Sequence, residues 1–558
     1  MQYAQFTELY ESLAKTSKRL EKVDILAEFL KKLKHHPPQL IYLLKGRTFP
    51  DYDSREFGIS DKLVVKAISK ASGVSENEIM KKYKKIGDLG ELAEEFVGKR
   101  KQSTLFHSTL DAQKVLENLK KLAEIQGKGT VDKKLSLISE ILNTASGKEA
   151  KYITRTLLSD LRIGVADGVL RDALAKAFFP NEEMSERIER AYDISNDYAQ
   201  IFTAASKGEK ELEKITISPG RPIKVMLPIK VSNLEEAFRI CGTPAAIEHK
   251  YDGFRVVINK DEKNRISLFT RRLENVTSQF PDVVEAVKKH VKGNSFILDS
   301  EVVGFDPKTK QYKPFEAVSQ RIKRKYDIEK LEKELPVEIN VFDIIYYNNK
   351  VIAQENFIER RKLLEKIIPI IEKKIRPSMQ FITSDIKKAQ DFYNKALKIG
   401  EEGIMMKKLD APYQAGRRVG YMIKMKPDVA ELDLVIVGAE YGSGKRAGWL
   451  TSYTIACKSN DEFLEIGKVS SGLKEKEEEP GTTYDEMTKI LKPLILEEKG
   501  KSVSVKPKTV VSVTYQNIQK SPSYSSGYAL RFPRITHYRP DRKPYDIATL
   551  KDIEKEVK

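Results

Sequence analysis

The first 214 residues repeat a helical pattern of hydrophobic and polar positions. After Leu20 the apolar side chains return every three or four residues until Pro37 and Pro38 end the run. The apolar positions are Val23, Ile25, Leu26, Phe29, Leu30 and Leu33. The segments VLENLKKLAEIQG, KKLSLISEILNTA and VLRDALAKAFF have similar spacing, with glycines and polar turns between them. The pattern predicts an all-α region over residues 1–214.

The pattern changes near residue 215. Runs such as FRVVINK, RISLFT, SFILDSEVVGF and VEINVFDIIYY are short and of β type, and helical segments such as VVEAVKKHV separate them. This mixture predicts an α/β domain over residues 215–427. After Pro427 only strand patterns are expected, among them LDLVIVGAEYG, WLTSYTIACKS, FLEIGKVSSG and TVVSVTYQNI. Residues 428–558 are therefore expected to form an all-β domain, a small barrel of the oligonucleotide-binding (OB-fold) type.

Length and charge support this division and narrow the class of partner. At roughly 100–200 residues per domain, a chain of 558 residues has about three domains. The net charge is +18, from 99 Lys and Arg against 81 Asp and Glu, which points to a polyanion and first of all to nucleic acid. Solvated charged helices would give the same composition. A high charge content with little cysteine is also typical of heat-adapted chains.

The scarcity of cysteine and the lack of long apolar runs argue against several other classes of protein. Only Cys241 and Cys457 occur, too few for a disulfide framework or a four-cysteine zinc site. No window approaches the roughly 18 apolar residues of a membrane helix, and the N-terminus has no basic region followed by an apolar run. We therefore expect a cytoplasmic, nucleoid-associated protein with no membrane partner.

The segment EHKYDGFR, residues 248–255, carries candidate chemistry. It joins an apolar strand, PAAIE, to the alternating strand FRVVI, so Lys250 is expected at a turn that faces a cleft. Protonated lysine is a poor nucleophile, but nearby cations or desolvation lower the pKa of a lysine and free its amine for attack. The alternative interpretation is a surface turn in which Gly253 provides the bend.

A series of short motifs follows Lys250 in the α/β region. They are TRRLE at 270–274, DSE at 299–301, FD at 342–343, EGIMMK at 402–407 and KMK at 424–426, and each is expected at the end of a strand. Together with RTLLSDLRIGVADGVLRDALAKAF in the helical region and RFPRITHYRPDRK near the C-terminus, the series resembles the covalent nucleotidyltransferase superfamily. Within that superfamily the chain is similar, over essentially its whole length, to ATP-dependent DNA ligases of the archaeal and eukaryotic replicative type.

The resemblance implies both a fold and a function. It implies an all-α DNA-binding domain at 1–214, an α/β nucleotidyltransferase (adenylylation) domain at 215–427 and an OB-fold domain at 428–558. Such an enzyme seals nicks in duplex DNA in replication, repair and recombination. Its cosubstrate is ATP, and the reaction passes through a lysyl-AMP intermediate and then an adenylylated 5′-phosphate.

By the same resemblance, Lys250 is the nucleophile that attacks the α-phosphorus of ATP. Glu248 would meet the adenine, Phe342 would stack on it, and Arg255 and Glu301 would hold the ribose. These roles suit the residue types, because a flat ring stacks on a flat base and a carboxylate accepts hydrogen bonds from a hydroxyl. Phe342 taken alone would be interpreted as a core residue.

The resemblance also implies residues for the metal and the α-phosphate. Glu301 and Glu402 would hold a hard cation, Mg²⁺ or Mn²⁺, beside the phosphates, although a lone Glu at a strand end is often half of a surface ion pair. Lys424 and Lys426 are two apart on a strand, so both point to one face. There they would neutralise the α-phosphate and favour attack by Lys250; an exposed basic strand is the alternative.

Arginines complete the implied nucleotide site. Arg271 is placed to hold a phosphate with two hydrogen bonds. The final motif of the family usually ends Arg-x-Asp-Lys, whereas this chain has RPDRK at 539–543. Arg539 and either Arg542 or Lys543 would therefore meet the pyrophosphate. The chain departs a second time at DSE, where Asp-Gly-Glu is common.

Partners follow from the same comparison of motifs. The helical region should clamp nicked duplex DNA through backbone phosphates with little base reading, since a nick occurs in any sequence. The segment QSTLF at 102–106 resembles the peptide by which replication proteins dock on a sliding clamp of the PCNA type, with Gln102, Leu105 and Phe106 as contacts. A buried Phe106 beside the next helix is the alternative. We expect a monomer.

Three other classes of function remain to be separated. A messenger RNA capping enzyme shares the lysine chemistry but uses GTP, and such enzymes lack the large helical region. An NAD-dependent ligase is disfavoured because two cysteines cannot build the zinc finger that this family carries. A DNA-binding scaffold with a decayed site is disfavoured by the complete set of lysines and carboxylates.

Overall fold

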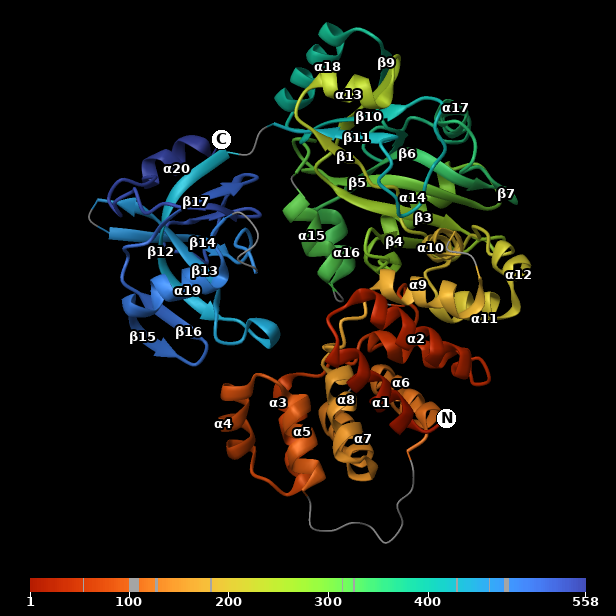
Figure 1. The fold of residues 1–558 in the computed structure, drawn as a ribbon. Coiled ribbons are helices and arrows are strands. Elements are labelled where there is room, and N and C mark those ends of the chain that lie inside the picture. Colours follow the sequence, from red (N-terminus) through yellow and green to blue (C-terminus); the bar gives the residue numbers. More distant parts are fainter. Residues whose placement is uncertain are drawn as a thin grey trace. The chain divides into compact units, whose positions relative to one another are not determined.

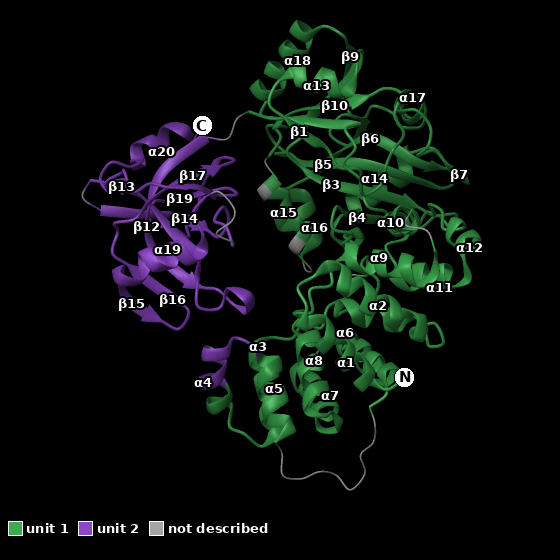
Figure 2. Ribbon diagram, in the orientation of Figure 1, with its two compact units in different colours: residues 1–79, 89–427 green, residues 80–88, 428–558 purple. Residues whose placement is uncertain are grey.

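The computed structural model describes residues 1–53, 55–99, 110–125, 129–180, 183–313, 315–324, 327–427, 430–460, 462–475 and 481–557. These residues form two compact units (Figure 2). The first consists of residues 1–79 and 89–427, and the second of residues 80–88 and 428–558. In the described ranges no helix combines the length and the apolar character needed to cross a membrane.

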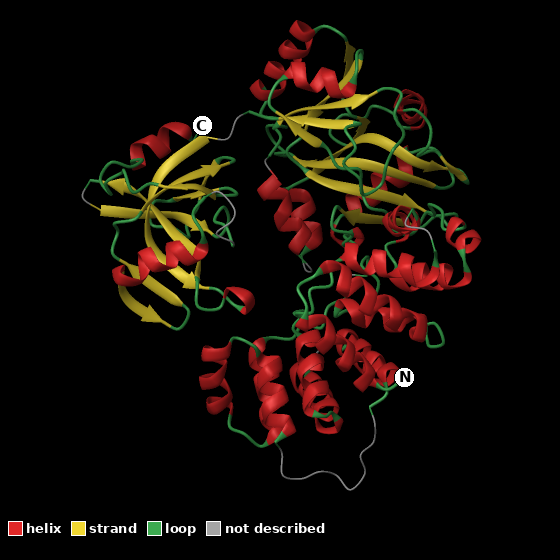
Figure 3. Ribbon diagram, in the orientation of Figure 1, coloured by secondary structure: helices red, strands yellow, loops and turns green. Residues whose placement is uncertain are grey.

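The N-terminal region is helical, as the apolar spacing predicted (Figure 3). The predicted run after Leu20 is α2, and it buries Val23, Leu26, Phe29 and other apolar residues. Its helices, with the 3₁₀ turn η1, are α1 (Tyr3–Lys15), α2 (Arg19–Leu33), η1 (Pro38–Lys45), α3 (Asp61–Ser72), α4 (Glu76–Ile86), α5 (Leu89–Gly98), α6 (Ala112–Glu124), α7 (Thr130–Thr144), α8 (Gly147–Leu157), α9 (Asp167–Phe178), α10 (Met184–Ser195), α11 (Tyr198–Lys207) and α12 (Glu209–Glu213).

The α/β region contains two sheets and the helices that cover them (Figure 1). The strand order is β1-β11-β10-β2-β9 in the five-stranded sheet and β4-β3-β5-β6-β7 in the six-stranded sheet, where β8 also pairs with β6. The strands are β1 (Ile229–Val231), β2 (Ala245–Lys250), β3 (Phe254–Lys260), β4 (Ile266–Thr270), β5 (Phe296–Gly304), β6 (Val337–Tyr347), β7 (Lys350–Val351), β8 (Ile375–Pro377), β9 (Gln380–Thr383), β10 (Gly403–Lys408) and β11 (Met422–Met425). The helical elements are α13 (Leu234–Cys241), η2 (Thr277–Gln279), α14 (Pro281–His290), α15 (Phe315–Lys323), α16 (Ile328–Glu334), α17 (Phe357–Ile367) and α18 (Ile386–Lys398).

Each sheet packs one face on helices. Because successive side chains of a strand point to opposite faces, one set of apolar residues is buried on each side. In the five-stranded sheet, Ile247 and Ile404 share a core with residues of α13 and α18. In the six-stranded sheet, Val256 and Leu298 share a core with residues of α14 and α17.

The other faces of the two sheets meet in a third core. Val257 and Ile297 of the six-stranded sheet are buried together with Met422 of the five-stranded sheet, and Met405 packs against them. The domain is therefore layered as helices, sheet, sheet and helices. Polar side chains on the inner faces are forced into the space between the sheets, which is where the site lies.

The C-terminal region forms a curled antiparallel sheet, as the β-type runs predicted. Its central strand β12 pairs with β13 along one side, while β17 and β16 follow one another along the other. Its elements are β12 (Ala430–Tyr441), η3 (Gly444–Arg446), β13 (Leu450–Ser459), β14 (Glu462–Val469), α19 (Tyr484–Leu491), η4 (Lys492–Leu494), β15 (Ile495–Lys499), β16 (Ser502–Val505), β17 (Val510–Tyr515), β18 (Ile518–Lys520), β19 (Tyr528–Leu530), β20 (Arg534–Tyr538) and α20 (Leu550–Glu556).

The expectation of strands alone after Pro427 is wrong, because α19 and α20 belong to this region. Each begins with a capping box, Thr483 with Glu486 in α19 and Thr549 with Asp552 in α20. Met487 and Ile553 anchor the two helices in the core of the sheet. The helices have 8 and 7 residues, so the helical spacing repeats too few times to stand out from the surrounding strands.

A buried ion pair joins α17 to the six-stranded sheet and generates a stability prediction. Nε of Arg360 lies 2.7 Å from Oδ1 of Asp343, and the side chains are 1% and 2% exposed. Arg360→Met would leave Asp343 buried and unpaired, so we expect the free energy of unfolding to fall by about 3–5 kcal/mol. Urea denaturation measures this change.

The matched control is Lys362→Ala on the same helix. Lys362 pairs with Glu359 at 2.8 Å, but both side chains are more than half exposed. Loss of such a pair should cost about 0–1 kcal/mol. Equal destabilisation by the two substitutions would contradict a special role for the buried pair.

Candidate active site

The register of three neighbouring strands gathers the basic motifs on one face of the five-stranded sheet. Lys250 ends β2 and pairs with Gly403, and Glu248 pairs with Met405 on β10. Met405 in turn pairs with Lys424 on β11. Since paired residues share a face, and residues two apart do as well, these side chains lie on the side of Met405. That side faces the six-stranded sheet.

The six-stranded sheet supplies the opposite wall. Arg255 on β3 pairs with Glu301 on β5, and Asp299 precedes Glu301 by two residues on the same strand. All three share the face of Ile297, which belongs to the core between the sheets. The two sheets thus bring the carboxylates and Arg255 toward the lysines of β2 and β11.

The expectation that every motif ends a strand is wrong for two of them. DSE at 299–301 lies within β5 and FD at 342–343 within β6. Both strands are long and central, and their mid-strand polar residues are tolerated because each has a partner: Asp299 pairs with Arg255 of the same sheet and Asp343 with Arg360 of α17. Ser300, the residue that departs from the family pattern, is fully buried and donates a hydrogen bond of 2.8 Å from Oγ to the carbonyl of Val256.

Phe342 occupies a β-bulge. Asp299 pairs with Asp343 and Ser300 pairs with Val341, so Phe342 is the extra residue between these pairs. Cζ of Arg255 lies 5.3 Å from the centroid of its ring. A bulge re-aims a side chain, and here it leaves the ring half-buried at the site rather than within the core.

Lys250 and Lys426 share the carboxylate of Glu402. Nζ of Lys250 is 2.8 Å from Oε2 of Glu402, and Nζ of Lys426 contacts the same oxygen. Burial raises the pKa of Glu402, but the two ammonium groups outweigh burial and lower the pKa to about 2. Glu402 therefore stays ionised and ties the end of β2 to the segment after β11.

A second carboxyl group, Glu301, faces this cluster. The pKa of Glu301 is raised to about 8, chiefly by burial; Lys250 and Arg255 oppose the rise, and Glu402 and Asp299 add to it. The described residues hold no group of three or more His, Cys, Asp or Glu side chains arranged to bind a metal. The charge of Glu402 nevertheless lies near enough to disfavour ionisation of Glu301.

Lys424 and Arg271 add positive charge at the same place. Burial lowers the pKa of Lys424, and Lys426, Lys250 and Arg271 lower it further. Burial likewise lowers the pKa of Lys426, with Lys250 adding to the shift and Glu402 opposing it. Arg271 itself stands on an exposed turn after β4. A cluster of cations with depressed pKa values is a site prepared for an anion.

Glu248 is held by residues to which the sequence motifs gave no role. Oε2 of Glu248 lies 2.8 Å from Nζ of Lys407, and Oε1 accepts a hydrogen bond of 3.0 Å from Nε2 of Gln380. Nζ of Lys407 also donates to the carbonyl of Phe342 at 2.9 Å, which links the two sheets. Lys407 is the last residue of the EGIMMK motif and lies two residues after Met405 on β10. Because side chains two apart on a strand share a face, this spacing indicates that Lys407 points inward as Met405 does.

The C-terminal arginines lie in the second unit and are paired there. NH1 of Arg539 is 3.2 Å from Oδ2 of Asp433 on β12, and Nε of Arg542 is 3.4 Å from the same oxygen. NH2 of Arg539 also contacts Asp541 at 2.7 Å. Arg542 rather than Lys543 shares this carboxylate with Arg539. The candidate clamp residues Gln102, Leu105 and Phe106 lie outside the described residues.

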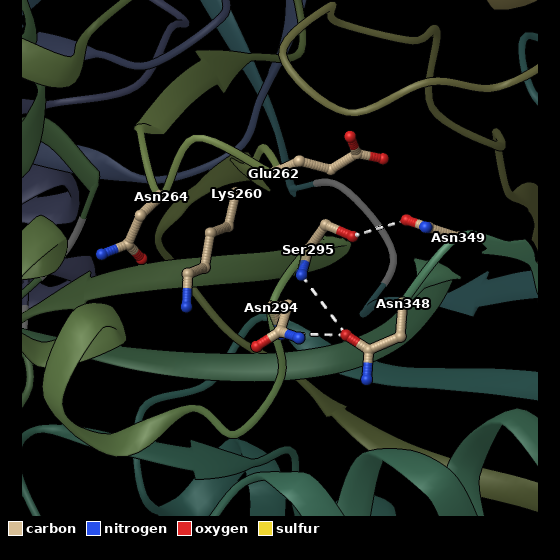
Figure 4. Close-up of a pocket in the computed structure, with 7 residues that line it drawn as sticks. All are labelled: Lys260, Glu262, Asn264, Asn294, Ser295, Asn348 and Asn349. Atoms are coloured by element: carbon tan, nitrogen blue, oxygen red, sulfur yellow. Dashed lines mark hydrogen bonds between the residues drawn. The ribbon is translucent and has the colours of Figure 1, made fainter.

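A solvent cavity of about 650 Å³ occurs elsewhere on the six-stranded sheet (Figure 4). Oδ1 of Asn348 accepts hydrogen bonds from the backbone N–H groups of Asn294 and Ser295 at 2.8 and 3.3 Å. Its lining is formed by Lys260, Glu262, Asn264, Asn294, Ser295, Asn348 and Asn349. None of these belongs to the sequence motifs, so this cavity lies apart from the chemical site.

Comparison with known proteins agrees with this architecture in every region. A family model described as the ATP dependent DNA ligase domain matches residues 225–426. The DNA ligase N terminus matches residues 2–175, and the ATP dependent DNA ligase C terminal region matches residues 446–542. The matches thus cover the helical, α/β and β regions in their order along the chain.

Relatives match the chain over its length. A DNA ligase of Nanoarchaeum equitans is 46% identical, with 99% of this chain and 98% of the relative covered. A DNA ligase of Thermococcus onnurineus is 41% identical, with 99% and 97% covered. A solved structure described as Pmar-Lig_PreS3 has a TM-score of 0.59 at 17% identity and covers 96% of this chain and 99% of its own, which shows a shared fold.

Two sheets that enclose a carboxylate-bound lysine are the architecture of a nucleotidyltransferase domain, and along the sequence a helical region precedes this domain and a curled β region follows it, in the order of the DNA ligase family models. The chain belongs to the ATP-dependent DNA ligases of archaea. Members of this family use ATP, act on nicked DNA and work through a lysyl-AMP intermediate.

Proposed function

We propose that Lys250 is the residue that becomes adenylylated. The observation that carries this proposal is the position of its Nζ, 2.8 Å from Glu402 at the end of β2 and between the inner faces of the two sheets. Its unprotonated amine attacks the α-phosphorus of ATP, an N–P bond forms and pyrophosphate leaves. Lys424 and Lys426 neutralise the charge that builds on the α-phosphate during this displacement.

The nucleoside is held by the facing sheet. Phe342 stacks on the adenine, Glu248 contacts the base, and Arg255 with Glu301 binds the ribose. The half-buried ring at the bulge and the guanidinium 5.3 Å from it support this assignment, because a base and its sugar need adjacent aromatic and polar surfaces. Arg271, on its exposed turn, binds a phosphate further along the nucleotide.

Glu301 and Glu402 fit a divalent cation such as Mg²⁺ or Mn²⁺. Mg²⁺ is usually bound by one or two carboxylates together with substrate phosphates, and the charge of Glu402 disfavours that of Glu301, an opposition that a bound cation would relieve. When bound, the metal would neutralise charge on the phosphate oxygens. The residues of the chain orient the nucleotide for attack.

The later steps use the same pocket with DNA in place of pyrophosphate. The AMP passes from Lys250 to the 5′-phosphate of the nick, and the 3′-hydroxyl then attacks that phosphate and releases AMP. The net charge of +18 supports binding to duplex DNA and association with the nucleoid. The protein acts as a monomer, and the segment 102–106 docks on a sliding clamp.

The first prediction tests the nucleophile. Lys250→Ala should abolish the covalent protein–AMP adduct, and Lys250→Arg should do no better because a guanidinium remains protonated at working pH. Incubation with labelled ATP and Mg²⁺, followed by denaturing electrophoresis, measures the adduct. Labelled GTP run in parallel distinguishes capping chemistry. Appreciable adduct in either variant would show that Lys250 is not the nucleophile.

The second prediction separates the steps of the reaction by domain. Arg539→Ala with Arg542→Ala and Lys543→Ala should lower self-adenylylation severely, because in-line displacement places negative charge on the leaving pyrophosphate. Sealing of a pre-adenylylated nick should be largely preserved, because no pyrophosphate leaves in that step. Lys424→Ala, which removes a charge beside the AMP, is the comparison variant and should impair both steps. Equal loss of both activities in the triple variant, with DNA binding intact, would contradict the division of steps.

The third prediction concerns the clamp. Leu105→Ala with Phe106→Ala should weaken binding to a PCNA-type sliding clamp, because an apolar anchor is lost. Surface plasmon resonance measures the affinity, and clamp-free nick sealing should be unchanged. Ser103→Ala with Thr104→Ala is the matched control. Unchanged affinity in the Leu105 and Phe106 variant would rule out this contact.

A further inference from the structure

The hydroxyl of Tyr413 lies inside the nucleotidyltransferase domain, where it joins three segments. Tyr413 belongs to the stretch between β10 and β11 and is 3% exposed. Its hydroxyl donates a hydrogen bond of 2.7 Å to Oδ2 of Asp299 on β5. It also accepts a hydrogen bond of 3.0 Å from the backbone N–H of Met226, which precedes β1. One phenol thus spans chain positions that are far apart in sequence.

The hydroxyl of Tyr413 bonds a carboxylate whose burial would be costly without hydrogen-bond donors. Asp299 is fully buried, and its two oxygens are held in a two-point pair by Arg255, with Nε at 2.8 Å from Oδ1 and NH2 at 2.5 Å from Oδ2. A buried carboxylate needs several donors to remain ionised. Tyr413 supplies the third donor, on the oxygen that NH2 of Arg255 also uses.

Arg255 is fixed on its other side by the same segment. Its NH1 donates to the carbonyl of Met226 at 2.8 Å, so Met226 bonds Tyr413 through its N–H and Arg255 through its carbonyl. These contacts use Nε–H and one N–H on each terminal nitrogen. NH2 also donates to the hydroxyl of Tyr413 at 3.5 Å, so of the five donors of a guanidinium the second N–H of NH1 is left for a ligand beside Phe342.

We infer that Tyr413 is a positioning residue that orients Arg255 for the ribose hydroxyls of ATP, through Asp299, Met226 and the hydrogen bond that its hydroxyl accepts from NH2 of Arg255. This inference rests on the proposed role of Arg255 at the ribose. Tyr413 does not touch the reacting atoms, so its loss should act on recognition of the sugar rather than on the chemical step. The phenol remains a donor at working pH, because burial raises the pKa of Tyr413 well above its ordinary value.

The test compares ATP with 2′,3′-dideoxyATP in self-adenylylation. The wild-type enzyme should prefer ATP, and Tyr413→Phe should reduce this preference by about tenfold, the equivalent of one hydrogen bond. The reduction should come from a higher KM for ATP, with kcat and the reaction of 2′,3′-dideoxyATP nearly unchanged. A variant that is merely less stable would lose activity with both nucleotides alike, which would overturn the inference.

The matched control is Tyr346→Phe on β6. Tyr346 is also buried, at 7% exposed, and its hydroxyl hydrogen-bonds with Ser295 near the cavity of Figure 4. The Tyr346→Phe variant should prefer ATP over 2′,3′-dideoxyATP as strongly as the wild type does. In an Arg255→Lys background, Tyr413→Phe should cause no further loss of preference, because the residue through which it acts is already gone.

The outcomes separate the inference from the proposed function beneath it. If Arg255→Lys removes the preference for ATP while Tyr413→Phe retains it, Arg255 binds the ribose and the role of Tyr413 is wrong. If Arg255→Lys leaves the preference unchanged, both the proposed role of Arg255 and the inference fail. A selective loss in Tyr413→Phe that disappears in the Arg255→Lys background supports the inference.

Discussion

The structure of the nucleotidyltransferase domain depends on the cost of holding many charges between two sheets. Lys250 lies close enough to Lys424 and Lys426 to lower the pKa of both, and the carboxylate of Glu402 offsets this positive charge. A site that leaves positive charge incompletely offset is stabilised by the phosphates of a nucleotide. The same imbalance that would destabilise an empty domain therefore favours binding and lowers the cost of charge developing in the reaction.

Compensation of buried charge also fixes the side chains on the two walls of the site. Lys407 bonds both Glu248 on its own sheet and the carbonyl of Phe342 on the other. Asp299 is satisfied by Arg255 together with Tyr413. Each contact provides a hydrogen-bond or ionic partner for a buried polar group, and each fixes the position of a side chain that faces the nucleotide. Stability and recognition are thus carried by the same hydrogen bonds.

The second unit follows the same rule with less burial. Arg539 and Arg542 share Asp433, and each has a further exposed carboxylate at Asp541 or Asp546. Partly exposed pairs of this kind are weak, because water competes for both charges. Cations held by weak pairs can exchange one anionic partner for another, which suits residues proposed to meet pyrophosphate in only one step of the reaction.

The sequence by itself determined the order of helical, α/β and curled β regions, since hydrophobic spacing reports which face of each element is buried. It also determined the family, through motifs whose residue types match the chemistry. It missed α19 and α20, whose two turns repeat the pattern too briefly, and it placed DSE and FD at strand ends. Only the tertiary structure decided the partners of the buried charges. The bulge at Phe342 and the contact of Tyr413 with Asp299 arise from register and from packing between distant segments, and local spacing carries no record of either.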